Sequence, residues 1–160
     1  MVKVLFVCLG NICRSPTAQG VFTALINREG LSNVVSVDSA GTGAWHVGDQ
    51  PDRRAQAAAK TRGYDLSTQR ARQIKETDYL DFDYIIAMDS QNHSDLSIKA
   101  PTNALDRIHM FLSFAPKKGI RDVPDPYYGG ADGFNHVLDL IEAASLGLLH
   151  DMRKRHFIGD

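Results

Sequence analysis

The segment that most constrains this chain is Cys8-Leu9-Gly10-Asn11-Ile12-Cys13-Arg14-Ser15-Pro16. The apolar run 2–7 precedes it and predicts a strand that is buried on both faces of a parallel sheet. A helical pattern follows it, with Ser15 as a good N-cap residue and Pro16 suited to the first helical position. Cys8 should therefore lie at the carboxyl end of a strand, in a short loop that leads into a helix. In open α/β sheets, ligands bind at that place.

The loop after this strand has the features of an anion-binding site. Backbone N–H groups of the loop and of the first helical turn, together with the helix dipole, attract negative charge. Gly10 lets the backbone turn freely, and Asn11 tolerates a left-handed conformation better than most residues. Arg14 supplies a planar cation that suits two oxygens of a phosphate, and this positive field should hold Cys8 as a thiolate. A thiolate beside a phosphate cradle is a nucleophile aimed at phosphorus.

A plainer interpretation makes Cys8 a buried structural cysteine before an ordinary strand-to-helix turn. The Gly-Asn pair inside the loop and the Arg-Ser pair at the start of the helix favour a phosphate site instead. The segment is not a Walker loop, because no Gly-Lys-Ser/Thr follows, and it lacks the glycine triplet of the Rossmann fingerprint.

The remaining pattern predicts the elements around this loop. Helices are expected over 17–29, 52–62, 91–98 and 132–155, with a short helical turn at 78–81. Further strands are expected over 34–37 and 84–88, and a fourth within 105–111. Residues 113–131 form a long loop, and such loops in compact domains are usually functional. Strands that alternate with helices predict an α/β fold, here a single doubly wound domain over residues 1–160 with a four-stranded parallel sheet flanked by helices.

Size and charge exclude several classes of partner. The chain has 160 residues and a net charge of −1, so no broad basic field indicates nucleic-acid binding. No apolar stretch approaches membrane-spanning length, and the N-terminus lacks a signal-peptide pattern, so no membrane partner is expected. The 2 cysteines are too few for a disulfide scaffold and suit a reducing compartment, so we expect a cytoplasmic protein. The 6 histidines show no ligand-like spacing, and we expect neither a metal nor a cofactor.

The run from Val7 to Pro16 resembles the signature of the low-molecular-weight protein tyrosine phosphatases. The resemblance extends along almost the whole chain and implies a hydrolase that acts on phosphotyrosine in proteins. Further motifs recur in the same order: Asp38-Ser39-Ala40-Gly41-Thr42, Pro51-Asp52-Arg53-Arg54-Ala55, Arg70-Ala71-Arg72-Gln73, Ala87-Met88-Asp89 and Asp125-Pro126-Tyr127-Tyr128-Gly129.

The resemblance implies a mechanism with a phosphocysteine intermediate. Thiolate Cys8 attacks phosphorus in line while Arg14 and the loop amides hold the equatorial oxygens. The Ser15 hydroxyl stabilises the thiolate as the leaving group of the second step, and Ser39 supports Asn11 through hydrogen bonds. The residues implied to bind the phosphate are Leu9, Gly10, Asn11, Ile12, Cys13, Arg14 and Ser15.

Asp125 is the candidate for the general acid and base. It lies between Pro124 and Pro126, which restrict the backbone and favour an extended residue 125 that can reach over a cleft. The alternative is an ordinary turn aspartate, and Asp89 and Asp122 are the other candidates. The resemblance implies that Asp125 protonates the leaving oxygen and then, as a carboxylate, activates the water that hydrolyses the phosphocysteine.

Aromatic residues are candidates for the rim of the site. Trp45 lies in a glycine-rich loop, where it could plug the core, whereas the resemblance implies that it forms one wall of the substrate cleft. Tyr127 and Tyr128, with Leu9 and Ile12, would add an apolar rim that favours an aryl phosphate. In relatives the tyrosine pair can be phosphorylated or take part in self-association, which suggests a weak homodimer through the active-site rim.

Other polar residues receive simpler interpretations. Arg70, Arg72 and Lys75 form a small basic cluster that we interpret as a solvated face. In mammalian relatives a histidine at the position of Gln69 helps to order the phosphate loop, and glutamine cannot replace its charge. His46 has no assigned role.

Three other functions compete with this interpretation. A thiol-dependent arsenate reductase uses the same loop and fold but needs further cysteines, and no cysteine follows Cys13. A protein-arginine phosphatase carries a threonine where this chain has Ile12, and the bulky Ile12 with the tyrosine pair favours phosphotyrosine. A phosphopeptide-binding module would have no use for Cys8 or Asp125.

Cys13 lies five positions after Cys8 and allows two interpretations. It can pack behind the loop as a small apolar residue. It can also protect the nucleophile, because a sulfenic acid formed on Cys8 by peroxide would be intercepted by a Cys8–Cys13 disulfide.

Overall fold

The computed structural model describes residues 1–127 and 130–156 and shows a four-stranded parallel sheet in the order β2-β1-β3-β4. This arrangement confirms the predicted doubly wound α/β fold. The strands are β1 (Val2–Cys8), β2 (Val35–Gly41), β3 (Tyr84–Ala87) and β4 (Ile108–Met110). Because β2 and β3 lie on opposite sides of β1, the strand order reverses beside β1, and ligands bind at such a switch point.

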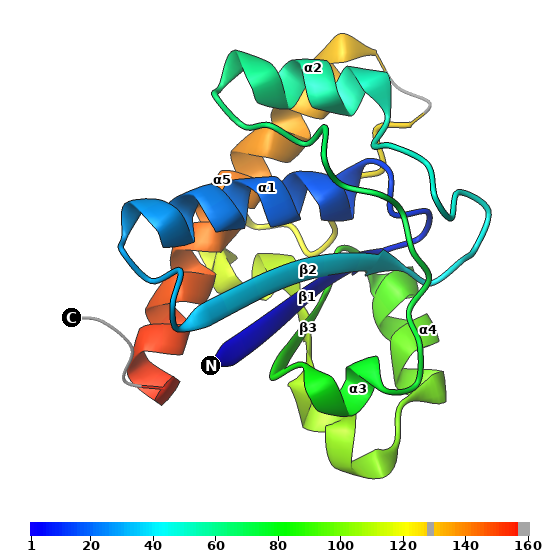
Figure 1. The fold of residues 1–160 in the computed structure, drawn as a ribbon, viewed down its shortest axis with the longest axis vertical. Helices are drawn as coiled ribbons and strands as arrows, with labels where there is room; N and C mark the ends of the chain where they lie inside the picture. Colours follow the sequence, from blue (N-terminus) through cyan, green and yellow to red (C-terminus); the bar gives the residue numbers. More distant parts are fainter. Residues whose placement is uncertain (128–129, 157–160) are drawn as a thin grey trace.

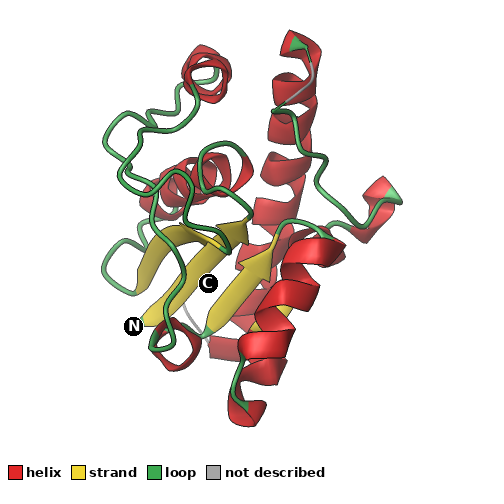
Figure 2. Cartoon of the chain, turned by 90° about the vertical axis from the view of Figure 1, so that its right-hand side faces the viewer, coloured by secondary structure: helices red, strands yellow, loops and turns green. Residues whose placement is uncertain are grey.

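Helices cover both faces of this sheet (Figure 1, Figure 2). On one face lie α1 (Arg14–Arg28) and α5 (Ala131–His156), with α2 (Arg53–Thr61) packed on both of them. On the other face lie α3 (Asp78–Asp81) and α4 (Ser90–Lys99). Short 3₁₀ helices at Thr102–Arg107, Phe111–Phe114 and Pro116–Lys118 flank β4 and enter the long loop before α5.

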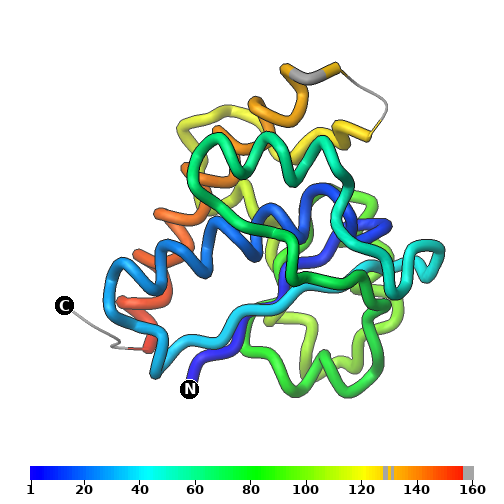
Figure 3. Tube along the Cα trace, turned by 45° about the horizontal axis from the view of Figure 1, so that its top comes forward, coloured from blue at the N-terminus to red at the C-terminus, as the bar shows by residue number. Residues whose placement is uncertain are grey.

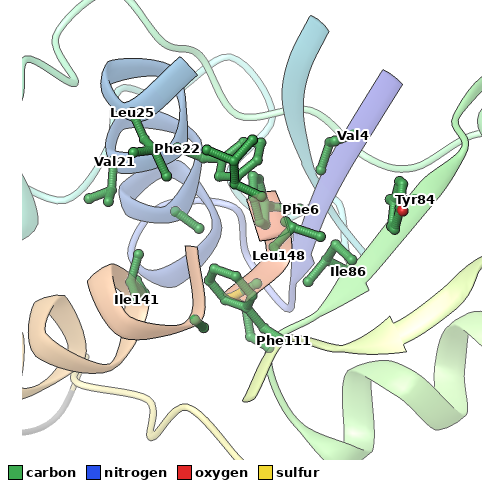
Figure 4. Close-up of a cluster of buried hydrophobic side chains, with 14 of the residues drawn as sticks. Val4, Phe6, Val21, Phe22, Leu25, Tyr84, Ile86, Phe111, Ile141 and Leu148 are labelled. Carbon is green, nitrogen blue, oxygen red and sulfur yellow. The ribbon is translucent and has the colours of Figure 1, made fainter. Parts of the chain in front are cut away.

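Strand β1 is buried on both faces, as its apolar run predicts. Val4 and Phe6 point to the α1 and α5 side, where Phe6 packs on Phe22 and Phe111 (Figure 4). Leu5 and Val7 belong to the core on the α3 and α4 side. The strand that ends at the candidate nucleophile is therefore fixed from two directions by packing.

Two elements differ most from their predicted extents. Helix α1 begins at Arg14 with Cys13 as its N-cap, so Ser15 is not the cap and its hydroxyl is used elsewhere. Pro16 lies in the first turn, where its missing N–H still costs nothing. Strand β2 is longer than expected because β1 pairs with it from Val2 opposite Val35 to Cys8 opposite Gly41.

The loops at the carboxyl ends of β1 and β2 lie side by side (Figure 1, Figure 3). The N–H groups of Thr42 and Gly43 donate to the carbonyl oxygens of Cys8 and Leu9, each at 2.9 Å. A Cβ on Gly41 would lie 2.8 Å from the Leu9 carbonyl oxygen, so this close approach requires glycine. Among the residues that the structure describes, no helix is long and apolar enough to cross a membrane.

Candidate active site

Asn11 holds the loop after β1 in its shape. Its φ of 56° is the left-handed conformation that the sequence predicts for this position. Its side-chain amide donates to Ser15 Oγ at 2.8 Å and to Ser39 Oγ at 3.0 Å, and its Oδ1 accepts the N–H of Arg72 at 3.0 Å. Ser39 Oγ donates in turn to Gln19 Oε1 at 2.6 Å. This buried network fixes the loop from three other parts of the chain.

Cys8 lies at the carboxyl end of β1 with its Sγ 3.0 Å from Ser15 Oγ. Since Ser15 Oγ already accepts the amide of Asn11, the hydroxyl hydrogen is available to the sulfur. Ser15 can take this position because it lies within the first turn of α1 rather than at the cap.

Gly10 serves a different purpose from the one predicted. Its φ is not in the positive range, so it is not required for a left-handed turn. A Cβ on Gly10 would instead lie 3.1 Å from Cδ2 of His46, which is tight for a carbon contact. His46 borders the same pocket as Cys8 and has its Nδ1 3.2 Å from Asp49 Oδ2. No sequence signal marked His46 as part of the site.

Arg14 is buried at the start of α1, and its guanidinium faces three oxygens. Its Nη1 donates to Asp89 Oδ2 at 2.6 Å and to the Val123 carbonyl at 3.0 Å, while its Nη2 lies 3.7 Å from Asp125 Oδ2. Burial by itself lowers the pKa of Arg14, but the negative charges of Cys8 and Asp89 outweigh burial and raise it. The guanidinium therefore remains a fixed positive charge in the site.

Asp125 is the predicted acid, and the structure brings it to this guanidinium. Its Oδ1 accepts the backbone N–H of Tyr127 at 3.0 Å, which leaves Oδ2 on the side of Arg14. The carboxylate is partly exposed and borders the pocket that contains Cys8. Nucleophile, cation and candidate acid, separated by up to 117 positions in the sequence, thus meet at one place.

The two other candidates for the acid do not border this pocket. Asp89 is bound to Arg14 and accepts the N–H of Asn92 at 2.7 Å as the N-cap of α4. Asp122 accepts the N–H and the hydroxyl of Ser90 at 3.0 and 2.8 Å. Both carboxylates are therefore engaged in structural contacts.

Arg54 links the phosphate loop to the segment that carries Asp125. It donates to the Tyr127 carbonyl at 2.7 Å, and its guanidinium lies over the rings of Tyr127 and Phe134 at 5.4 and 5.0 Å. It also forms an ion pair with Asp52 at 3.1 Å, and the Asp52 N–H donates to the Ile12 carbonyl at 2.8 Å. The sequence did not indicate this connection.

The residues of the site enclose a pocket of about 280 Å³. Trp45 borders it and is exposed, so this side chain is not a core plug. Tyr128, which was also predicted at the rim, lies outside the described residues. The lining residues are Cys8, Leu9, Gly10, Ile12, Cys13, Arg14, Trp45, His46, Asp125 and Tyr127.

One polar interpretation, that of Arg72, needs correction. Arg72 does not belong to a solvated face, because it bonds Asp38 at 3.1 Å and Asp78 at 2.9 Å, and through its N–H it supports the phosphate loop. Gln69 donates to the carbonyl of Pro16 at 2.9 Å, and so contacts α1 where the loop ends.

Cys13 is buried beside the pocket and differs electrostatically from a reactive thiol. Burial, followed by the negative charges of Asp52 and Cys8, raises its pKa to about 12. At neutral pH this sulfur is therefore a protonated thiol and does not compete with Cys8 for phosphorus.

A cysteine and an arginine in one pocket, at the switch point of a doubly wound sheet, define a class of enzymes that act on phosphate esters or similar oxyanions. Residues 3–157 match the family model of the low molecular weight phosphotyrosine protein phosphatases. The chain is 43% identical over 156 residues to a low molecular weight protein-tyrosine-phosphatase of Streptomyces coelicolor, covering 96% of this chain and 94% of that one.

Solved structures agree with this match. A protein tyrosine phosphatase from Entamoeba histolytica superposes with a TM-score of 0.94 at 39% identity, covering 96% of this chain and 98% of that one. A Drosophila arginine phosphatase superposes with a TM-score of 0.87 at 33% identity, covering 99% of both chains. The chain belongs to the low molecular weight phosphotyrosine protein phosphatase family.

Proposed function

We propose that this enzyme hydrolyses phosphotyrosine in proteins through a phosphocysteine intermediate on Cys8, with Asp125 as general acid and base. The observation that carries the proposal is the meeting of Cys8, Arg14 and Asp125 in one pocket, behind aromatic side chains at its opening. The first two supply a nucleophile and a cation, and the third supplies a proton donor within reach of a leaving group.

In the first step the Cys8 thiolate attacks phosphorus and the bond from phosphorus to the tyrosine oxygen breaks. Protonated Asp125 gives its proton to that oxygen, so a neutral phenol leaves. Arg14 and the backbone N–H groups of the loop stabilise the charge on the equatorial oxygens.

In the second step a water molecule attacks the phosphocysteine and gives a proton to the Asp125 carboxylate. The S–P bond breaks, phosphate is released and Cys8 returns to the thiolate. Ser15, whose Oγ lies 3.0 Å from Cys8 Sγ, donates to the sulfur as negative charge develops there. Both steps use only groups of this chain and water.

The shape of the pocket favours phosphotyrosine over phosphoarginine. Ile12, Trp45 and Tyr127 border it, and such apolar and aromatic side chains suit a phenyl ring better than a charged guanidinium. Rates on three peptides that differ only in phosphotyrosine, phosphoarginine or phosphoserine test this. We expect kcat/KM on phosphotyrosine to exceed the others by at least about 10-fold. Faster hydrolysis of phosphoarginine would indicate that this chain is an arginine phosphatase, like the Drosophila protein that superposes on it.

We propose further that Cys13 protects Cys8 from irreversible oxidation. Peroxide oxidises the Cys8 thiolate to a sulfenic acid, and the Cys13 thiol then displaces water to form a disulfide. We expect peroxide to inactivate the enzyme, phosphate to slow this loss and dithiothreitol to restore activity. Cys13→Ser should retain most of its basal activity but recover far less after peroxide. Equal recovery of the variant and the wild type would reduce Cys13 to a packing residue.

The weak homodimer through the active-site rim, predicted from the tyrosine pair, stays a prediction that sedimentation at increasing protein concentration can test.

A further inference from the structure

We propose that a groove beside the catalytic pocket binds the substrate polypeptide next to its phosphotyrosine, through a bulky apolar side chain of that polypeptide. This inference rests on the proposed phosphatase function and extends it to the choice of protein substrate. The groove has a volume of about 790 Å³ and lies between the loop after β2, the segment 73–76 and helix α4.

The groove adjoins the catalytic pocket. Leu9 and Trp45 border both hollows, so these two side chains form the wall between them. The catalytic pocket, at about 280 Å³, has room for a phosphorylated side chain but not for the polypeptide that carries it. That polypeptide must cross the rim, and on this side it crosses directly from Leu9 and Trp45 into the groove.

The walls of the groove expose apolar surface that water disfavours. Leu9 is 42% exposed, Trp45 74% and Ile98 of α4 78%. Large apolar side chains gathered at one hollow mark a binding surface, and tryptophan in particular is enriched at protein interfaces. The occupant must therefore present an apolar side chain to this surface.

The charges of the groove argue against a strongly acidic or basic occupant. Lys75 and Lys99 line it together with Glu76 and Asp95, so positive and negative groups balance. Asp95 Oδ1 accepts the side-chain amide of Gln91 at 2.9 Å and is already satisfied. A peptide whose residues near the phosphotyrosine are apolar fits this lining better than one with a run of like charges.

The test compares substrates with and without a polypeptide. Ile98→Glu places a charge in the groove at an exposed position outside the catalytic machinery, and Leu146→Glu is a matched control on α5, where Leu146 is 59% exposed. We measure kcat/KM for p-nitrophenyl phosphate and for two phosphotyrosine peptides, one flanked by leucines and one by serines. Thermal unfolding of each variant checks that the fold is intact.

We expect Ile98→Glu to lower kcat/KM on the leucine peptide by about 10-fold, with p-nitrophenyl phosphate unchanged and little effect on the serine peptide. Leu146→Glu should match the wild type on all three. An equal loss on p-nitrophenyl phosphate, or no loss on the leucine peptide, overturns the groove as a binding site. Absence of turnover by the wild-type enzyme on every phosphotyrosine substrate would instead refute the proposed function itself.

Discussion

Replacement of Cys8 by serine should lower the turnover of p-nitrophenyl phosphate by about 10⁴-fold or more, to the background of the assay. The hydroxyl of serine is scarcely ionised at neutral pH, so it is a far weaker nucleophile than the thiolate that it replaces. The exchange of one atom should leave the buried packing at the end of β1 intact. The loss would therefore report on chemistry rather than on folding.

Two controls separate loss of the nucleophile from loss of the site. The serine variant should still bind phosphate, because Arg14 and the amides of the loop are unchanged, and isothermal titration can measure this. Wild-type enzyme quenched during turnover should carry a phosphate on Cys8 by mass spectrometry, which the variant cannot form. Substantial activity of the variant, or a phosphate trapped elsewhere, would contradict the assignment.

The change Asp125→Asn should lower the rate of phosphoryl transfer by about 10²- to 10⁴-fold, the usual contribution of general acid catalysis. Asparagine keeps the size of the side chain and can still accept the N–H of Tyr127 through its Oδ1. It has no proton to give to the leaving oxygen. The effect should therefore be largest for leaving groups of high pKa, which most need that proton.

A series of aryl phosphates with leaving groups of different pKa, assayed in single-turnover mode, measures this dependence. Asp122→Asn is the matched control, because Asp122 lies in the same loop but bonds Ser90 rather than facing the pocket. It should change the rate far less and show no trend along the series. If Asp125→Asn slows every leaving group equally, Asp125 has a structural role and Asp89 becomes the next candidate.

The sequence was most informative where packing or backbone geometry restricts the residue type. The apolar run 2–7 predicted a strand buried on both faces, and Asn11 marked a left-handed position. The same local information misplaced Ser15 as an N-cap. A serine near a helix start can cap the helix or, as here, use its hydroxyl from within the first turn, and the sequence does not distinguish the two. The Ser15 partners Cys8 and Asn11 become visible only when the loop closes on itself.

Contacts between distant segments were the least predictable part of the site. Arg72 was interpreted as part of a solvated face, because the residue type alone does not show its ion pairs with Asp38, 34 positions away, and with Asp78, 6 positions away. Arg54 donates to the Tyr127 carbonyl across 73 positions. Because every residue has a backbone carbonyl, the amino-acid sequence does not indicate which one accepts this hydrogen bond. The position of Asp125 at the pocket was predictable because its two flanking prolines restrict it locally and because it belongs to a motif.

The bonds that shape the loop around Asn11 come from the protein itself, so the cradle is formed in this structure without an ester. A cavity that is shaped in advance for a tetrahedral oxyanion binds both the phosphoryl group of the ester and the free orthophosphate that hydrolysis releases. Each catalytic cycle thus ends with orthophosphate bound in this cavity. The orthophosphate must dissociate before Cys8 can attack the next ester. In a cell, the concentration of free phosphate would then set the fraction of enzyme molecules whose active site is free to bind a substrate.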